Sequence, residues 1–294
     1  MKNQAGRVVV GYDGTLSSVR ALDWATAEAQ RRELPLTIMH IVKPLTAIAR
    51  AADARHWPEL FENEGREIVE LGAQRARMTT SIDIATENSV ARVSGTLIAA
   101  TGQARLLVLG SPEPHAPTGI ARHSVARTVS AGAYCPCVVV RGDSSALAGP
   151  QRPIVVGVDG TPGSRVALRY AAAVAVESSA VLRVVAAYRS PGTRSAADHA
   201  VESAVDQALV RFPELIVSTQ TSSGPVASVL SETAHGAGLL VIGPRRHTGP
   251  VRVRPGSVSH GLLSTAPCPI VFVHQAWPVP GTRRGRTPRE TTVS

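Results

Sequence analysis

The residues best suited to hold a ligand stand in one glycine- and arginine-rich segment in the second half of the chain. The segment reads Gly243-Pro-Arg-Arg-His-Thr-Gly249 and continues, after six further residues, with Gly256-Ser257-Val258-Ser259. Glycine lets a backbone approach a phosphate closely, and the free N–H groups at a helix start attract negative charge. Arg245 and Arg246 could add charge-assisted hydrogen bonds to the same phosphate. The segment predicts a phosphate-binding loop, and a solvated loop whose glycines only make turns is the alternative.

Other reactive side chains do not form a catalytic or metal-binding set. Cys135, Cys137 and Cys268 lie at the start of apolar segments, where small buried thiols are common, and redox sensing is the alternative. A short segment with Glu113 and two histidines lacks the second half of a metal-ligand set. No nucleophile, general base and orienting group can be matched, so we expect binding rather than catalysis.

An internal repeat organises the chain. Val8–Ala29 aligns with Ile154–Ala175 at an offset of 146 residues, and 12 of these 22 positions are identical. A second match, at an offset of 133, aligns Leu106–Gly110 with Leu239–Gly243. A period this long indicates two homologous domains in tandem rather than a solenoid. We expect domains at 1–142 and 153–275, a linker at 143–152 and a disordered basic tail at 276–294.

Each copy alternates short apolar strands with helices. In the first copy we expect strands at 7–12, 36–42, 81–86, 106–110 and 138–141, and helices at 17–32, 58–77, 91–101 and from about 124. The second copy repeats this order from 154 to 273, and Trp24 and Tyr170 take equivalent helix positions that suit core or interdomain packing. Continuous Val, Ile and Leu strands predict an α/β fold with helices on both faces of a five-stranded parallel sheet. We expect each repeat to build a sheet of its own.

The strand order places the candidate ligand loops. If the order is 3-2-1-4-5, strands 1 and 4 are neighbours where the winding reverses, and ligands bind beyond their carboxyl ends. The loops there are 13–15 with 110–123, and 159–161 with 243–256. Both end at a predicted helix start, where a serine could act as N-cap or as a phosphate contact.

Composition limits the class of protein. The formal charge is +9, from 31 basic and 22 acidic residues, and 29 of the basic residues are arginine. This balance favours polyanionic ligands, but the arginines are scattered and aromatic residues make up 3%, which argues against a stacking platform for single strands. No apolar run approaches the roughly 20 residues needed to cross a bilayer. Three cysteines cannot build a disulfide framework, so we expect a cytoplasmic protein.

Motifs at both ends of each unit carry a family resemblance. In the second copy they are Val155-Val-Gly-Val-Asp-Gly-Thr161, Leu240-Val-Ile-Gly243, Gly256-Ser257-Val258 and Ala266-Pro-Cys-Pro-Ile-Val271. In the first copy they are Val9-Val-Gly-Tyr-Asp-Gly-Thr15, Met39-His-Ile41, Leu107-Val-Leu-Gly110 and Cys135-Pro136. Together they resemble the universal stress protein family in its tandem, two-domain form, over roughly residues 7–142 and 153–274.

The resemblance implies a nucleotide site in the second copy. ATP-binding members of this family carry a glycine, two residues, a second glycine, nine residues, and a third glycine followed by Ser or Thr. Gly243, Gly256 and Ser257 match this pattern, whereas Arg246 stands at the middle glycine. The family's acidic nucleoside contact maps to Asp159, and the residue that reads adenine through its backbone maps to Ala187. The predicted site comprises Asp159, Gly160, Thr161, Ala187, Gly243, Arg245, Arg246, Gly249, Gly256, Ser257, Val258 and Ser259.

The first copy departs further from the pattern. Gly110 and Ser124 match, but Glu113 and His123 replace the other two glycines. Glu113 would set a carboxylate near a phosphate chain, and His123 has a Cβ where the backbone must approach closely. We therefore expect a weaker or vestigial site formed by Asp13, Gly14, Thr15, Ile41, Gly110, Ser124 and Val125.

The implied function is a cytoplasmic regulator of stress response or growth that binds ATP, with Mg²⁺ as an accompanying cation, and hydrolyses it slowly at most. A nucleotide-independent interaction module of the same fold is the alternative. The repeat implies an intramolecular pseudo-dimer, and by analogy with the family a homodimer of the chain. We also expect a regulatory protein partner, and neither a membrane nor a specific nucleic acid as a target.

Overall fold

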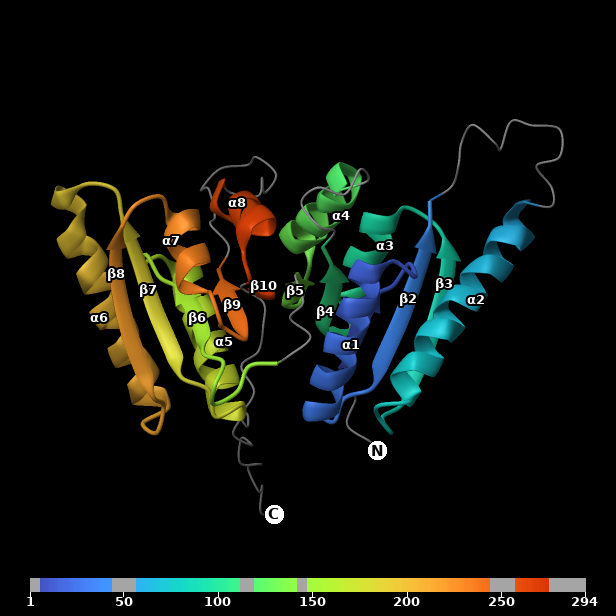
Figure 1. The fold of residues 1–294 in the computed structure, drawn as a ribbon, viewed down its shortest axis with the longest axis horizontal. Helices are drawn as coiled ribbons and strands as arrows, with labels where there is room; N and C mark the ends of the chain where they lie inside the picture. The colour runs from blue at the N-terminus through green and yellow to red at the C-terminus, as the bar shows by residue number, and fades with distance from the viewer. Residues whose placement is uncertain (1–5, 44–56, 112–118, 142–146, 244–256, 275–294) are drawn as a thin grey trace, which may run out of the picture.

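The computed structural model describes residues 6–43, 57–111, 119–141, 147–243 and 257–274, in which strands alternate with helices (Figure 1). The first half contains β1 (Arg7–Gly11), α1 (Leu16–Arg31), β2 (Leu36–Val42), α2 (Trp57–Arg77), β3 (Ile84–Val90), α3 (Val93–Ala100), β4 (Ala104–Gly110), α4 (Gly119–Gly132) and β5 (Cys137–Val140). The second half contains β6 (Ile154–Gly157), α5 (Pro162–Glu177), β7 (Leu182–Tyr188), the short 3₁₀ helix η2 (Pro191–Thr193), α6 (Arg194–Arg211), β8 (Val217–Ser223), α7 (Val226–Thr233), β9 (Leu239–Ile242), α8 (Ser257–Thr265) and β10 (Ile270–Phe272). The predicted α/β alternation is confirmed in both halves.

Two predicted boundaries are wrong. The strand β3 runs to Val90 rather than ending at 86, because it is a partly exposed edge strand with polar residues and no apolar run marks it. The helix α4 begins at Gly119, so Ser124 lies inside the helix and is not its N-cap. No proline or glycine between Gly119 and Ser124 would stop the helix from starting before Ser124. In the second half, by contrast, Pro255 and Gly256 directly precede the start of α8 in the sequence.

The ten strands of the described residues form one sheet, in the order β3-β2-β1-β4-β5-β10-β9-β6-β7-β8. Counted within each half the order is 3-2-1-4-5, and neighbouring strands of one half are parallel. The expectation of a separate sheet for each repeat is wrong, because β5 and β10 pair antiparallel with Val139 opposite Ile270. Each half would otherwise leave its fifth strand as an edge with unpaired N–H and C=O groups, and the junction satisfies both edges. The strands of each half stay together, so the tandem interpretation stands.

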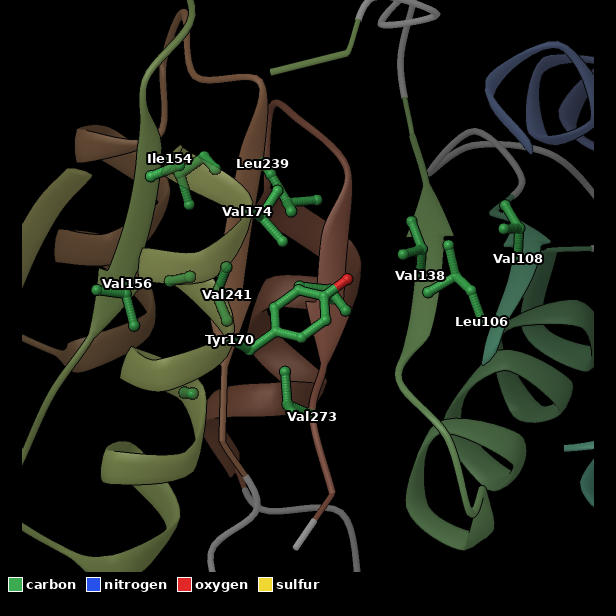
Figure 2. Packing of buried hydrophobic residues seen from close by; sticks show 14 of the residues in the cluster. Leu106, Val108, Val138, Ile154, Val156, Tyr170, Val174, Leu239, Val241 and Val273 are labelled. Carbon is green, nitrogen blue, oxygen red and sulfur yellow. The ribbon is translucent and has the colours of Figure 1, made fainter. Parts of the chain in front are cut away.

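Helices cover both faces of this sheet. The helices α1, α2, α5 and α6 pack on one face, and α3, α4, α7 and α8 pack on the other. On each face the buried side chains of the two halves form one hydrophobic cluster. Figure 2 shows Val138 of the first half near the junction and the Tyr170 ring among side chains of the second half, including Val241 and Val273. The core therefore continues across the antiparallel junction.

The two halves pack as the internal pair that the repeat predicts. Trp24 and Tyr170 are 3% and 1% exposed and belong to the same cluster, so their predicted packing role is confirmed. Arg31 of α1 and Glu177 of α5 form an ion pair at 3.3 Å, and their sequence separation of 146 is the offset of the repeat. A contact between equivalent residues indicates an approximate two-fold relation between the halves.

The length and hydropathy of the helices test the expectation that the chain does not cross a membrane. Within the described ranges, no helix combines the length and the apolar character needed to cross a bilayer.

Candidate functional site

An aspartate and a threonine fix the turn after the first strand of each half. In the first half, the Thr15 backbone N–H and hydroxyl donate to Asp13 Oδ1, with distances of 3.1 and 2.5 Å. In the second half, Thr161 donates to Asp159 Oδ1 in the same way, at 3.1 and 2.6 Å. Each carboxylate is therefore held in one orientation before any ligand arrives.

A serine completes each turn from the following helix. The Ser18 and Ser164 hydroxyls donate to the carbonyls of Thr15 and Thr161, each at 2.9 Å. The Thr161 side chain accepts from the Ser164 N–H as an N-cap. Both serines line the hollows described below, and their identity in the repeat alignment was the signal that could have found them.

A hollow in the second half lies beyond the ends of β6, β7 and β9, against α7 and α8. Its volume is about 90 Å³. The lining residues are Gly157, Val158, Asp159, Thr161, Ser164, Val185, Ala187, Val226, Leu230, Ile242, Gly243, Val258 and Ser259. Of the predicted site residues, the structure thus brings together Asp159, Thr161, Ala187, Gly243, Val258 and Ser259. We call this cavity the second hollow.

An equivalent cavity, the first hollow, lies beyond β1, β2 and β4, against α3 and α4. Its volume is about 270 Å³. The lining residues are Gly11, Tyr12, Asp13, Ser17, Ser18, Met39, Ile41, Val93, Leu97, Leu109, Gly110, Val125 and Ala126. Of the predicted residues, Asp13, Ile41, Gly110 and Val125 line it.

Closer helix packing accompanies the smaller volume of the second hollow. A Cβ added to Gly261 of α8 would stand 3.0 Å from the Ala227 Cβ of α7. At the offset of 133, the corresponding residues of the first half are Thr128 and Ser94, which are larger. Glycine and alanine thus let α7 and α8 pack closely beside the second hollow.

The glycines after the fourth strands are required by packing. A Cβ at Gly110 would overlap the Ser17 carbonyl oxygen, and a Cβ at Gly243 would overlap that of Gly163. Since these are backbone atoms at the starts of α1 and α5, no side-chain movement relieves the overlap. Their repetition therefore follows from the contact between strand end and helix start, whether or not a phosphate binds nearby.

The remaining predicted residues divide into three groups. Gly14 and Gly160 each have φ of +74°, so they make the left-handed turn, but with Thr15 they do not line the two hollows formed by described residues. The predicted residues Arg245, Arg246, Gly249 and Gly256, and the tail 276–294, lie outside the described residues. For Ser124 and Ser257 only the backbone is described.

The helices at the two hollows present different parts of their backbones. The helix α8 begins at Ser257, so Val258 and Ser259, which line the second hollow, belong to its first turn. The first N–H groups of a helix have no partner within it and carry partial positive charge. Val125 and Ala126, which line the first hollow, lie beyond the first turn of α4, where N–H groups bond within the helix. Of these two equivalent helices, only α8 therefore presents its first turn to its hollow.

The walls of both hollows were missed by the sequence analysis. They come from Val93 and Leu97 of α3, and from Val226 and Leu230 of α7. These are ordinary apolar residues of short helices, and only the fold places them opposite the aspartate turn. No local signal distinguishes them from core residues.

The cysteines and His40 have structural surroundings. Burial raises the pKa of Cys135 and of Cys268 to about 12, so both thiols stay protonated near neutral pH. This disfavours redox sensing. His40 is 8% exposed, and its Nδ1 lies 2.8 Å from the Tyr12 carbonyl oxygen, as expected of a packed core residue. Across the described part of the chain, no group of three or more His, Cys, Asp or Glu side chains could hold a metal ion.

The fold and the two hollows define a duplicated, doubly wound α/β protein with a hollow at the equivalent place in each half. Comparison with known sequences then gives the family, because the profile of the universal stress protein family matches residues 5–141 and 151–274. The chain belongs to the universal stress protein family.

Relatives and solved structures agree with this assignment. Universal stress protein Rv2005c of Mycobacterium tuberculosis is 29% identical over 294 residues, covering 92% of this chain and 97% of the relative. A universal stress protein of Mycolicibacterium smegmatis is 26% identical over 290 residues, covering 90% and 96%. The crystal structure of a universal stress protein from Archaeoglobus fulgidus has 16% identity and a TM-score of 0.72, covering 92% of this chain and 99% of that one, and shows the shared fold.

Proposed function

We propose that this chain is a cytoplasmic regulator of stress response or growth that binds ATP in the second hollow and acts by binding rather than by catalysis. The observation that carries the proposal is the start of α8 at that hollow. The N–H groups of a helix start suit the phosphate groups of a nucleotide, because they supply donors and partial positive charge together.

The other walls of the second hollow suit a nucleoside. Val185, Val226 and Leu230 form an apolar surface of the kind that packs against a planar base. Ala187 lies at the carboxyl end of β7 in the same wall, where the family resemblance expects the backbone to read adenine. Asp159, oriented by Thr161, would accept a hydrogen bond from a ribose hydroxyl.

The two halves differ in what they offer to phosphate. The first hollow is larger, but α4 does not present its first turn to it, and its loop sequence carries Glu113. The second loop carries Arg245 and Arg246, and Mg²⁺ would accompany the nucleotide as its usual counter-ion. A charge-assisted contact contributes about 1.5–3 kcal/mol, which favours the second half for phosphate recognition.

Isothermal titration calorimetry of the full chain with ATP tests this proposal. We expect Asp159→Ala to abolish binding and Asp13→Ala, its matched control at the equivalent turn, to leave binding in place. Both substitutions remove the same carboxylate–threonine contacts, so a general effect on the turn would appear in both. Binding lost in Asp13→Ala and retained in Asp159→Ala, or no binding by the parent chain, would refute the assignment.

The alternative function is a nucleotide-independent interaction module. It is favoured by the packing requirement at Gly110 and Gly243, which explains part of the glycine pattern without a ligand. Mass spectrometry on an extract of gently purified protein separates the two functions, since a co-purifying adenine nucleotide is expected only for the first. A homodimer of the chain remains our expectation, and it would have to use a surface other than the β5 and β10 edges, which pair within the chain.

A further inference from the structure

A buried arginine of the first half holds the last turn of a helix in the second half. Arg141 follows β5 and is 7% exposed. Its guanidinium donates to the Leu263 carbonyl, to the Ser264 carbonyl at 3.1 Å and to the Ala266 carbonyl at 3.3 Å. It also donates to Ser111 Oγ in its own half at 3.3 Å. The last carbonyls of α8 have no partner within the helix, so Arg141 serves as their C-terminal cap from the other domain.

The second half places a histidine at the equivalent position. His274 follows β10, and its ring lies close to the Ser130 backbone in the last turn of α4. His274 lies 133 residues after Arg141, and Leu263 lies 133 residues after Ser130, so donor and acceptor are both related by the repeat offset. His274 therefore takes, across the pseudo-two-fold axis, the place that Arg141 takes in the first half.

The two anchored helices are those that wall the hollows. The first turn of α8 lines the second hollow, and its last turn is held by Arg141 of the first half. The helix α4 lines the first hollow, and His274 of the second half lies at its last turn. Because a helix moves nearly as a rigid rod, a shift at its anchored end displaces the end at the hollow.

We propose that Arg141 and His274 are reciprocal positioning residues, each setting the wall helix of the other half's site and thereby coupling the two sites. The coupling rests on the proposed nucleotide function, whereas the anchoring itself does not. Arg141 adds a permanent positive charge and several donors at a helix C-terminus. His274 supplies one ring donor, and its Nε2 is buried without a hydrogen-bond partner among the described residues. Anchoring of α8 is therefore the stronger of the two.

Hydrogen exchange on the ligand-free full chain tests the anchoring. Arg141→Met keeps the length of the side chain and removes its donors, so backbone amides in the last turn of α8 should exchange about tenfold faster or more. Arg169→Met, at an exposed arginine of α5, is the control and should change nothing in α8. Unchanged exchange in α8 of the folded Arg141→Met chain overturns the inference, whether or not the chain binds ATP.

A second pair of variants covers the case in which Arg141→Met does not fold. His274→Leu should speed exchange in the last turn of α4, and His274→Gln, which keeps an N–H donor, should restore much of the protection. Equal exchange in these two variants would contradict a hydrogen-bonding role for His274.

Calorimetry then tests the coupling, with the Asp13→Ala chain isolating the second site. Adding Arg141→Met to it should weaken ATP binding about three- to tenfold, although Arg141 belongs to the first half. Adding Arg169→Met should leave the affinity unchanged. Faster exchange in α8 with unchanged ATP affinity overturns the coupling. Absence of ATP binding in the parent chain refutes the proposed function, and the exchange experiment then still tests the anchoring on its own.

Discussion

The helices α1 and α5 occupy equivalent places in the two halves, and they meet at the junction with different charges. Glu28 and Arg31 of α1 correspond to Val174 and Glu177 of α5. In a two-fold pair of identical domains, a residue near the axis faces its own copy, so Arg31 would face an arginine. Here it faces Glu177 at 3.3 Å. Duplication within one chain thus allows equivalent positions to become complementary, which identical subunits cannot do.

The charged side of this junction is built around a buried carboxylate. Glu28 is 4% exposed and accepts two hydrogen bonds from Arg31, each of 2.8 Å, and one from Arg32 of 2.5 Å. Burial alone would raise the pKa of Glu28, but the hydrogen bonds and charges of Arg31 and Arg32 outweigh it and hold the pKa below its usual value. The first half contributes this network, whereas the second half contributes an apolar valine at the equivalent position.

The largest effect is expected when the buried carboxylate is removed. Glu28→Gln leaves two largely buried arginines without their main counter-charge, and should lower the free energy of unfolding by about 3 kcal/mol. Urea denaturation measures it, with Glu177→Gln as the matched control at the rim of the same cluster. Glu177 is 36% exposed, so its loss should cost under about 1 kcal/mol. Equal losses of unfolding free energy would show that burial does not increase the contribution of the Glu28 carboxylate to stability.

The same variant has a pH signature. Since the folded-state pKa of Glu28 is depressed, its stabilisation is present above the usual pKa of 4.5 and is lost as pH falls through the folded-state value. The parent chain should therefore lose more unfolding free energy below pH 4.5 than the Glu28→Gln chain does. Parallel pH curves would contradict the ion-pair interpretation.

The glycine at the end of the fourth strand should contribute to stability equally in the two halves. Gly110→Ala and Gly243→Ala should each lower the free energy of unfolding by about 1–3 kcal/mol, because the added methyl overlaps the backbone of the adjacent helix start. Thermal and urea unfolding measure the loss, and Gly192→Ala, where an added Cβ meets nothing within 4 Å, is the control. If Gly243→Ala left stability unchanged but abolished ATP binding, the glycine would serve the ligand rather than the packing.

The smallest effect is expected from reversing the charge at the axis. Glu177→Arg would place a cation beside Arg31 and Arg32, as in a pair of identical helices, and should cost about 1 kcal/mol after solvent screening. The cost should shrink in about 1 M salt, where the Debye length is near 3 Å. Glu202→Arg, at an exposed position of α6, is the control and should show no comparable loss. A loss that salt does not reduce would point to packing instead of charge.

Much of the fold could be predicted because the same motifs occur in both halves of the sequence. The identities at Asp13 and Asp159 and at Gly110 and Gly243 mark the ends of the first and fourth strands, and those strands are neighbours in both halves. Apolar runs predicted the central strands well, since central parallel strands are buried on both faces. The edge strand β3 was placed too early, because a strand half exposed to water carries no such run.

The sequence by itself determined the duplication, the α/β class and the position of the aspartate turn, because each depends on local pattern or self-similarity. Only the tertiary structure decided that β5 and β10 join the two halves into one sheet, since an open edge does not specify its partner. Only it decided that α8 begins at the second hollow, whereas α4 passes the first hollow beyond its own first turn. The contacts of Arg141 and His274 with the other half join residues more than 120 positions apart in the sequence. These side chains become buried only once both halves are packed together.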